Sequence, residues 1–283
     1  MVPTAIREYV RPMSVDDVWA MLAERGKAAQ VIGGGIDAHL YAVPDVSMLI
    51  DLTALGLSYV RGEEELAIGA TTTFAEILEA KPARAYLGGV LVDVLEQVAS
   101  PLQRNLGTIG GTIGSAHPWS DVIPLLLALG AELNVHDGRD RSIPLTQYLA
   151  DRASCGRPLI TEVRLPAPLP QSACAFEAFT TTGFDVAILN CACFVALDAG
   201  RCGPVRIAVG GTPALASRVS ALEEAVTGTA LDGATIDRVA SLATDAIDVR
   251  DDRRATADHR RVLARIGVAR CLRRVAGELG GTG

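Results

Sequence analysis

Apolar and polar residues alternate with short periods in the first half of the chain, and this pattern predicts short strands between helices. Ser14 precedes two acidic residues and apolar residues at helical spacing, which predicts a capped helix that ends at Gly26. Further helices are predicted at residues 72–80 and 88–100. Short strands are predicted at residues 30–34, 46–53, 57–62 and 65–70, with the last two forming a hairpin.

Two patterns follow residue 120. The apolar run between Asp121 and Gly130 predicts a buried helix. Residues 131–145 predict a hairpin that turns at Asp137 and Gly138, because Asp-Gly favours the backbone of a tight turn. Both elements have the lengths expected in a mixed α and β domain.

The second half of the chain has a different pattern. A strand is predicted at residues 159–166, and the prolines within residues 166–170 mark a domain boundary. Three antiparallel strands are then predicted at residues 173–182, 186–199 and 204–212. Three helices are predicted after them, at residues 214–227, 232–247 and 256–279.

The last predicted helix is rich in arginine. Two interpretations fit this pattern: a solvated helix face with the arginines pointing outward, or a docking face for a partner. The arginines are Arg260, Arg261, Arg265, Arg270, Arg273 and Arg274.

Composition and charge exclude several classes of function. The net charge is −7 and aromatic residues make up 4% of the 283 residues, which argues against nucleic acid or an anionic membrane as the target. No apolar run is long enough to span a membrane, and the first residues do not resemble a signal peptide, so we expect a cytoplasmic protein. The six cysteines show no C-x-x-C pair or metal-ligand spacing and predict reduced, buried thiols. We find no G-x-S-x-G motif and no acid/base pair, so we predict no catalytic or metal-binding residues.

A first glycine motif raises the question of a dinucleotide site. Gly33, Gly35 and Ala38 form G-x-G-x-x-A, and Asp51 follows Gly33 by 18 residues. Pro44 interrupts any helix within two turns, which leaves too little room for the crossover helix of a Rossmann unit. The motif therefore does not predict a Rossmann fold, and Asp51 is interpreted as an acid at the end of a strand.

A second glycine-rich stretch lies about 75 residues further on. Its glycines, within eight residues, predict irregular backbone that passes close to an anionic ligand. Two such loops suit one diphosphate held between two subdomains. Asp121 ends the stretch as either a helix cap or an acceptor for a ligand hydroxyl. The glycines are Gly107, Gly110, Gly111 and Gly114.

The two loops together resemble a known family. "VIGGGIDAHL" and "SPLQRNLGTIGGTIGSAHPWSDVIPLLLALGAEL" are similar to the FAD-binding loops in the flavoprotein subunit of molybdenum hydroxylases. This group contains the medium subunits of carbon monoxide dehydrogenase and the FAD domains of the xanthine dehydrogenase family. "LITEVRLP", "GFDVAILNCACFVAL" and "VRIAVGGTPALASR" extend the resemblance over nearly the whole chain.

The resemblance implies an α+β fold. A PCMH-type, two-lobed FAD-binding domain would occupy residues 1–167, with subdomains 1–55 and 56–167. Residues 168–283 would form a C-terminal domain of the carbon monoxide dehydrogenase flavoprotein type, with a three-stranded antiparallel sheet and a helix bundle.

The resemblance also implies a cofactor site. Backbone amides of both loops would surround the FAD pyrophosphate, Ala99 and Ser115 would lie along the cofactor, and Asp121 would bond to FAD hydroxyls. Leu159 and Ile160 would lie against the isoalloxazine ring or its neighbouring adenine-side strand. The residues implied for the pyrophosphate are Val31, Ile32, Gly33, Gly34, Gly35, Ile36, Asp37, Thr108, Ile109, Gly110, Gly111 and Thr112.

The implied function is electron transfer. The chain would be one subunit beside a large molybdopterin-binding subunit and a small subunit with [2Fe–2S] clusters, in a dimer of heterotrimers. Ile36, Thr112 and Ala178 depart from the family pattern, which leaves open a non-catalytic assembly or scaffold subunit with weak or lost FAD binding. A stand-alone PCMH-type flavin oxidoreductase is the other alternative, and it would need a base above the flavin.

Overall fold

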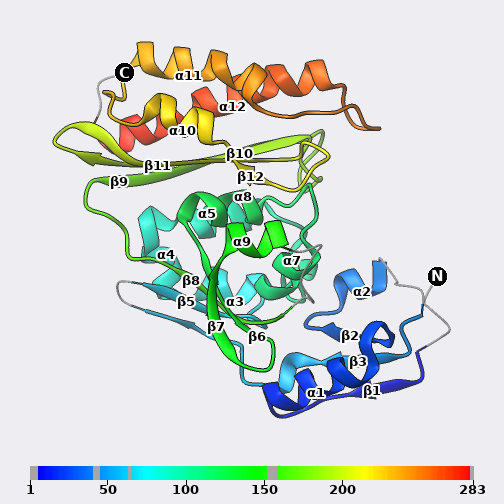
Figure 1. The fold of residues 1–283 in the computed structure, drawn as a ribbon. Helices are drawn as coiled ribbons and strands as arrows, with labels where there is room; N and C mark the ends of the chain where they lie inside the picture. The colour runs from blue at the N-terminus through cyan, green and yellow to red at the C-terminus, as the bar shows by residue number, and fades with distance from the viewer. Residues whose placement is uncertain (1–5, 41–44, 63–64, 152–157, 281–283) are drawn as a thin grey trace. The chain divides into compact units, whose positions relative to one another are not determined.

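The computed structural model describes residues 6–40, 45–62, 65–151 and 158–280, which form two compact units (Figure 1). The first unit comprises Met1–Pro82, Ala99–Ser115 and Glu132–Arg164. The second comprises Ala83–Val98, Ala116–Ala131 and Leu165–Gly283. Each unit is therefore assembled from separate stretches of the chain.

The first unit begins with a three-stranded parallel sheet in the order β1-β3-β2. Helix α1 covers it through Val18, which packs with Met48 and Ile50. The α1 helix starts at its cap Ser14, whose side chain accepts from the Asp17 amide, and Gly26 ends it, as predicted. The elements are β1 (Glu8–Val10), α1 (Val15–Arg25), η1 (Gly26–Ala28), β2 (Ala29–Ile32), α2 (Ile36–Leu40), β3 (Met48–Asp51) and η2 (Leu52–Ala54).

The glycine motif joins two of these parallel strands, although its helix is short. Within the described residues α2 has five residues, which is shorter than the crossover helix of a Rossmann unit. Asp51 ends β3, where its carboxylate accepts from the Thr53 amide and the Tyr9 hydroxyl. It is the strand-end acid that the sequence indicated.

A second sheet of the first unit has five strands in the order β4-β5-β8-β6-β7. The predicted hairpin turns after β6, where Gly138 adopts a φ of 92°. The strands are β4 (Val60–Arg61), β5 (Leu66–Gly69), β6 (Glu132–His136), β7 (Asp140–Pro144) and β8 (Leu159–Leu165). The helices are α3 (Phe74–Glu79), α6 (Pro101–Arg104), α7 (Ile109–Ser115) and α9 (Leu145–Ala150).

One prediction about this unit was wrong. The second glycine-rich stretch contains the helix α7, where irregular backbone was predicted. The Thr108 hydroxyl accepts from the Gly111 amide and its carbonyl accepts from the Thr112 amide, which starts the helix. Glycine disfavours helix, but a Cβ on Gly110 would lie 2.7 Å from the Ala70 carbonyl oxygen, so packing overrides propensity.

The second unit is built on a four-stranded antiparallel sheet in the order β12-β11-β10-β9. Helices α10, α11 and α12 lie over one face, and α5 and α8 contact the other (Figure 1). The three predicted strands are β9 (Ser172–Phe179), β10 (Leu189–Asp198) and β11 (Arg201–Gly210), and β12 (Ser217–Arg218) extends the edge. The helices are α4 (Lys81–Ala85), η3 (Tyr86–Gly89), α5 (Val90–Gln97), α8 (Val122–Leu129), α10 (Ser220–Val226), α11 (Gly233–Ala246) and α12 (Ala257–Glu278), with α4 crossing the division between the units.

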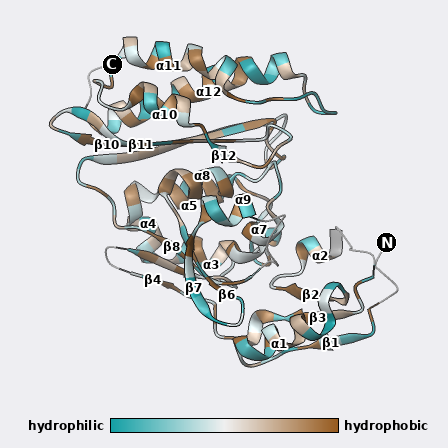
Figure 2. Cartoon of the chain, viewed as in Figure 1, coloured by the Kyte–Doolittle hydropathy of each residue, from teal (hydrophilic) through white to brown (hydrophobic). Residues whose placement is uncertain are grey.

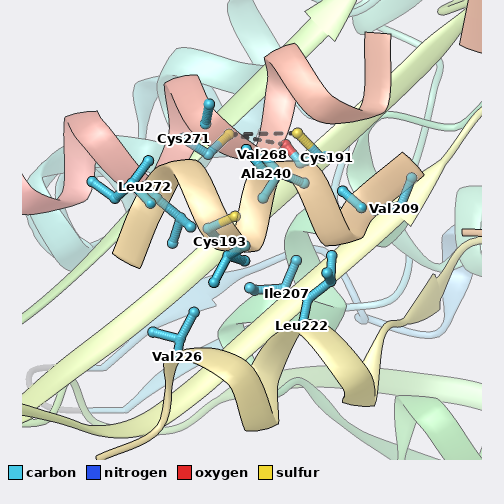
Figure 3. Packing of buried hydrophobic residues seen from close by; sticks show 14 of the residues in the cluster. Cys191, Cys193, Ile207, Val209, Leu222, Val226, Ala240, Val268, Cys271 and Leu272 are labelled. Carbon is cyan, nitrogen blue, oxygen red and sulfur yellow. Dashed lines mark hydrogen bonds between the residues drawn. The ribbon is translucent and has the colours of Figure 1, made fainter. Parts of the chain in front are cut away.

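Hydrophobic burial explains these positions. All eight residues of α8 are buried, and the helix is apolar on every side (Figure 2). The other face of the sheet packs Cys191 and Cys193 against Cys271 and Leu272 of α12 (Figure 3). The Cys191 and Cys271 sulfurs lie 3.6 Å apart. The five described cysteines are reduced and buried, as predicted, and Cys155 lies outside the described residues.

The arginines of α12 divide into two kinds. Arg260 is 1% exposed and donates to the carbonyls of Ile188, Gly211, Arg250 and Ala255 while pairing with Asp252. The outward-facing interpretation was therefore wrong for Arg260, because the helix start packs under these loops. The other five arginines are exposed. Among the helices that the structure describes, none is long and apolar enough to cross a membrane.

Candidate functional site

The two glycine loops lie directly against each other in the first unit. We call Val31–Asp37 the first loop and Thr108–Ser115 the second loop. A Cβ on Gly34 would lie 1.5 Å from the carbonyl oxygen of Leu106, just before the second loop. The Ser115 hydroxyl donates to the Asp37 carboxylate across the same contact. The structure thus brings together residues about 75 positions apart, and only glycine permits the approach.

Thr108 is the centre of this contact. Its side chain is buried, and its hydroxyl accepts from the Gly111 amide at 3.2 Å. Cβ atoms built on Gly33 and on Gly111 would lie 2.8 Å and 2.7 Å from the same hydroxyl oxygen. The missing side chains of both loops therefore make room for one threonine hydroxyl.

The amides of the second loop already have acceptors. Ile109 donates to the Thr72 carbonyl at 3.1 Å, and Gly110 donates to the Ala70 carbonyl at 2.9 Å. Gly111 and Thr112 both donate to Thr108. These bonds fix the second loop on the chain that follows β5.

The amides of the first loop are different. Gly33, Gly34, Gly35 and Ile36 donate to no acceptor among the residues that the structure describes. All four are partly exposed, and Gly35 has a φ of 77°. Successive unpaired amides where a strand gives way to a helix form an anion-binding site. The free donors therefore belong to the first loop, whereas the sequence interpretation had placed them on both loops.

The second unit contains Asp121, and its geometry contradicts one of the two interpretations left by the sequence, the helix cap. The Ser120 hydroxyl accepts from the Ile123 amide at 3.3 Å, and no cap bond comes from the Asp121 carboxylate. Asp121 Oδ1 instead accepts from Asn190 Nδ2 at 2.6 Å. Burial raises the pKa of Asp121 to about 6, and the Asn190 bond opposes this rise. Oδ2 has no partner among the described residues, so it can accept from a ligand hydroxyl.

The remaining predicted site residues are Ala99, Leu159 and Ile160. Ala99 has a φ of 55°, in the left-handed region, and its carbonyl accepts from Arg104. Leu159 is 4% exposed and packs in the cluster that contains Val18. Ile160 is also buried. The protein itself covers these two side chains.

Sequence reasoning missed Leu106 and Asn190. Leu106 contributes a carbonyl group, which no side-chain pattern can reveal. Asn190 has a signal in the sequence, since it is the polar residue inside the apolar run of β10 and is fully buried.

Two aromatic residues follow the second loop in the sequence. The rings of His117 and Trp119 stack with centroids 4.7 Å apart and planes 6° from parallel. Arg254 lies over the Trp119 ring at 5.1 Å. Within the described ranges, no group of His, Cys, Asp and Glu side chains could hold a metal ion.

These features define a class of protein. It is an α+β protein in which two glycine loops of the first unit contact each other, and the amides of the first loop have no acceptor among the described residues. Residues 4–168 match the FAD binding domain in molybdopterin dehydrogenase, and residues 174–275 match the CO dehydrogenase flavoprotein C-terminal domain. The chain belongs to this family of FAD-binding subunits of molybdenum hydroxylases, and FAD is its cofactor. The resemblance and the α+β, PCMH-type fold are thereby confirmed.

Relatives cover nearly the whole chain. The 6-hydroxypseudooxynicotine dehydrogenase complex subunit alpha of Paenarthrobacter nicotinovorans is 30% identical, over 94% of this chain and 93% of its own. The carbon monoxide dehydrogenase medium chain of Afipia carboxidovorans is 28% identical, over 97% of this chain and 98% of its own. A solved carbon monoxide dehydrogenase from Hydrogenophaga pseudoflava matches with a TM-score of 0.89 and 26% identity, covering 98% of this chain and 99% of that one. This chain is accordingly an oxidoreductase subunit.

Proposed function

We propose that this chain is the electron-transfer subunit of a molybdopterin-dependent hydroxylase or dehydrogenase, which takes electrons from a [2Fe–2S] subunit and passes them to an acceptor. The observation that supports this most directly is the row of four amides at Gly33–Ile36 that have no acceptor among the described residues, beside the glycines of the second loop. Such a row suits a pyrophosphate, because each oxygen can accept a bond without any charged side chain.

Different residues would bind different parts of FAD. The first loop would donate its amides to the pyrophosphate, and the second loop would let the cofactor approach its backbone at the exposed Gly111. Asp121 would accept from an FAD hydroxyl through Oδ2. When bound, FAD supplies the redox chemistry, and this chain supplies binding and orientation. We assign no catalytic acid, base or nucleophile to the chain.

We also propose the domain division at residue 167. The family matches, which end at 168 and resume at 174, support it. The three-stranded sheet within residues 1–55 and the five-stranded sheet within residues 56–167 support the two subdomains.

The proposed partners are a large molybdopterin-binding subunit and a small [2Fe–2S] subunit, in a dimer of heterotrimers. The relatives' descriptions as a medium chain and as a complex subunit support a multi-subunit assembly. The substrates in those names belong to those proteins.

The test starts with the purified chain. We expect it to show the two visible absorption bands of an oxidised flavin, or to bind added FAD with quenching of flavin fluorescence. Electrons should reach this flavin only when the partner chains and their substrate are present. Reduction by substrate without partners would instead identify a stand-alone flavin oxidoreductase.

A chain that binds no FAD would overturn the proposal and favour the assembly or scaffold alternative. The departure at Ile36 allows a second test, because the family commonly has Thr there. We expect Ile36→Thr to tighten FAD binding, since a hydroxyl at this position can donate to a phosphate.

A further inference from the structure

Asn190 is a polar residue in a strand that is otherwise apolar. It lies in β10 and is 0% exposed. Its neighbours Leu189 and Cys191 belong to the core cluster with α11 and α12. Because side chains alternate along a strand, Asn190 belongs to the face that contacts α8.

The Asn190 amide holds the start of α8. Nδ2 donates to Asp121 Oδ1 at 2.6 Å and to the Ser120 carbonyl at 3.1 Å. Both hydrogens of the amide are therefore used, and one of them fixes a carboxylate that does not cap its own helix.

This arrangement costs stability. Asn190 Oδ1 is buried with no hydrogen-bond partner among the described residues. Gly210, its partner in β11, makes room for it, because a Cβ there would lie 2.5 Å from Oδ1. A leucine could fill the space without an unpaired oxygen of its own, but it would remove the donor of Asp121 Oδ1 and of the Ser120 carbonyl. The amide therefore serves something other than packing.

The backbone holds the same segment from the same strands. The Gly211 amide donates to the Pro118 carbonyl at 2.8 Å. Arg260 donates to the Gly211 and Ile188 carbonyls at 3.0 and 3.1 Å. The segment before α8 is thus fixed by residues of the C-terminal family domain.

We propose that Asn190 is a positioning residue that fixes the Asp121 carboxylate for a hydroxyl group of FAD. The proposal rests on the proposed function, in which Asp121 faces the cofactor. It makes the C-terminal family domain part of the FAD site through one side chain that does not touch the cofactor.

Protonation of Asp121 supplies a readout that is specific to this role. A protonated carboxyl is a poorer acceptor, so FAD affinity should fall as the pH drops through the Asp121 pKa. Burial raises that pKa to about 6 and the Asn190 bond lowers it; no charged group contributes. The charged or titratable groups on the loop before α8 and on elements packed against α8 are His117, Asp93, Glu96, Cys174, Glu177, Cys191, Cys193, Asp198, Arg201, Cys202, Arg206 and Arg218.

The experiment is a double-mutant cycle on the full chain, with the FAD Kd measured by fluorescence quenching from pH 5 to pH 8. We expect Asn190→Leu to weaken FAD binding about tenfold at pH 7. It should also move the pH midpoint of binding upward, because it removes a bond to the charged form. In an Asp121→Ala background, the same substitution should change Kd less than about twofold.

The outcomes are separable. An equal loss in both backgrounds, or an unchanged pH midpoint, would reduce Asn190 to a structural residue and overturn the inference. A wild-type chain without FAD affinity would overturn the proposed function and this inference with it. If Asn190→Leu does not fold, Asn190→Ser replaces it, because the shorter hydroxyl cannot reach Asp121 and leaves less bulk. The same non-additivity with Asp121→Ala is expected.

Discussion

Gly34 meets the carbonyl oxygen of Leu106 so closely that a Cβ on Gly34 would lie 1.5 Å from that oxygen. Backbone on both sides of this contact is fixed, on one side by β2 and on the other by α6 and α7. The clash cannot be relieved by a rotamer change, since a carbonyl group has none. The contact therefore defines the geometry of both loops.

Gly34→Ala should separate the loops. We expect a loss of stability of about 2 kcal/mol or more, together with loss of FAD, because the backbone must move by more than an ångström. Thermal unfolding and flavin content measure the two effects. Gly277→Ala is the control, since Gly277 is exposed in α12 and a Cβ there meets nothing within 4 Å. A Gly34→Ala chain with wild-type stability would contradict the contact.

Ile36→Pro should weaken FAD binding without unfolding the chain. Ile36 is the first residue of α2, where proline fits a helix and only removes the amide hydrogen. Losing one bond to a charged phosphate should raise the Kd about tenfold or more. Ile36→Val keeps the amide and serves as the matched control in the same titration. Equal affinities of the two variants would mean that this amide does not bind the cofactor.

Asp121 should make the FAD-free chain less stable as the pH rises. Its pKa is about 6 in the folded chain and about 3.9 when unfolded, so the folded state holds the proton longer. The contribution of Asp121 to the stability of the chain is therefore highest below pH 4, and it falls as the pH rises toward 6. The two-unit difference corresponds to at most about 3 kcal/mol, and partial exposure reduces this to about 1 kcal/mol.

Asp121→Asn removes that ionisation. We expect it to stabilise the FAD-free chain by about 1 kcal/mol at pH 7.5 and to have little effect at pH 4, as measured by urea unfolding. Asp245→Asn, at an exposed position of α11, is the control and should show no such pH dependence. A stabilisation by Asp121→Asn that is larger at pH 4 would refute the sign of the pKa shift. FAD affinity of the wild-type chain should instead rise as the pH rises, because the charged Asp121 carboxylate is the better acceptor.

Arg260 should be necessary for folding, and its neighbour should not. Arg260→Leu removes the buried guanidinium that donates to four carbonyl oxygens and pairs with Asp252 inside the second unit. We expect a loss of about 3 to 5 kcal/mol in unfolding free energy. Arg261→Leu removes an exposed arginine paired with Asp258 and should cost less than about 0.5 kcal/mol. Similar losses from the two substitutions would contradict the buried network.

The cysteines of the second unit should be inert in the native chain. Burial raises the pKa of the Cys174 thiol, and hydrogen bonding to Cys271, followed by burial, raises the pKa of the Cys191 and Cys193 thiols, which opposes formation of the reactive thiolate. The same hydrogen bonds lower the pKa of Cys271, so its inertness depends on its complete burial. In a Cys155→Ser chain, a thiol reagent such as a water-soluble aromatic disulfide should label nothing in native buffer. It should label five thiols after denaturation. Fast labelling of the native chain would show that the core around Cys191 opens.

Local rules predicted many elements correctly. Helix α1 begins after Ser14 and ends at Gly26. The apolar run after Asp121 forms α8, and the turn at Asp137 and Gly138 closes the hairpin of β6 and β7. Each of these depends on neighbours within a few residues, or on burial of a segment that is apolar on all sides. The family resemblance rested on such local stretches too.

Other features could not be predicted from the sequence because they depend on residues far away in the chain. α7 forms from glycine-rich sequence because Ala70 and Thr72 supply acceptors from the end of β5. Asp121 was ambiguous because only Asn190, 69 positions away, determines where its carboxylate bonds. The sequence pattern allowed Arg260 to be a surface arginine, and only the loops that pack around it in the folded chain bury it.

The sequence by itself determined the secondary structure of the sheets and most helices, the family and FAD as the cofactor, because these follow from local patterns and motifs. The tertiary structure alone decided which amides and which Asp121 oxygen have no partner among the described residues, and which arginine is buried. Hydrogen-bond satisfaction is a property of the whole fold: a donor is free or occupied according to residues that the chain brings back from far away.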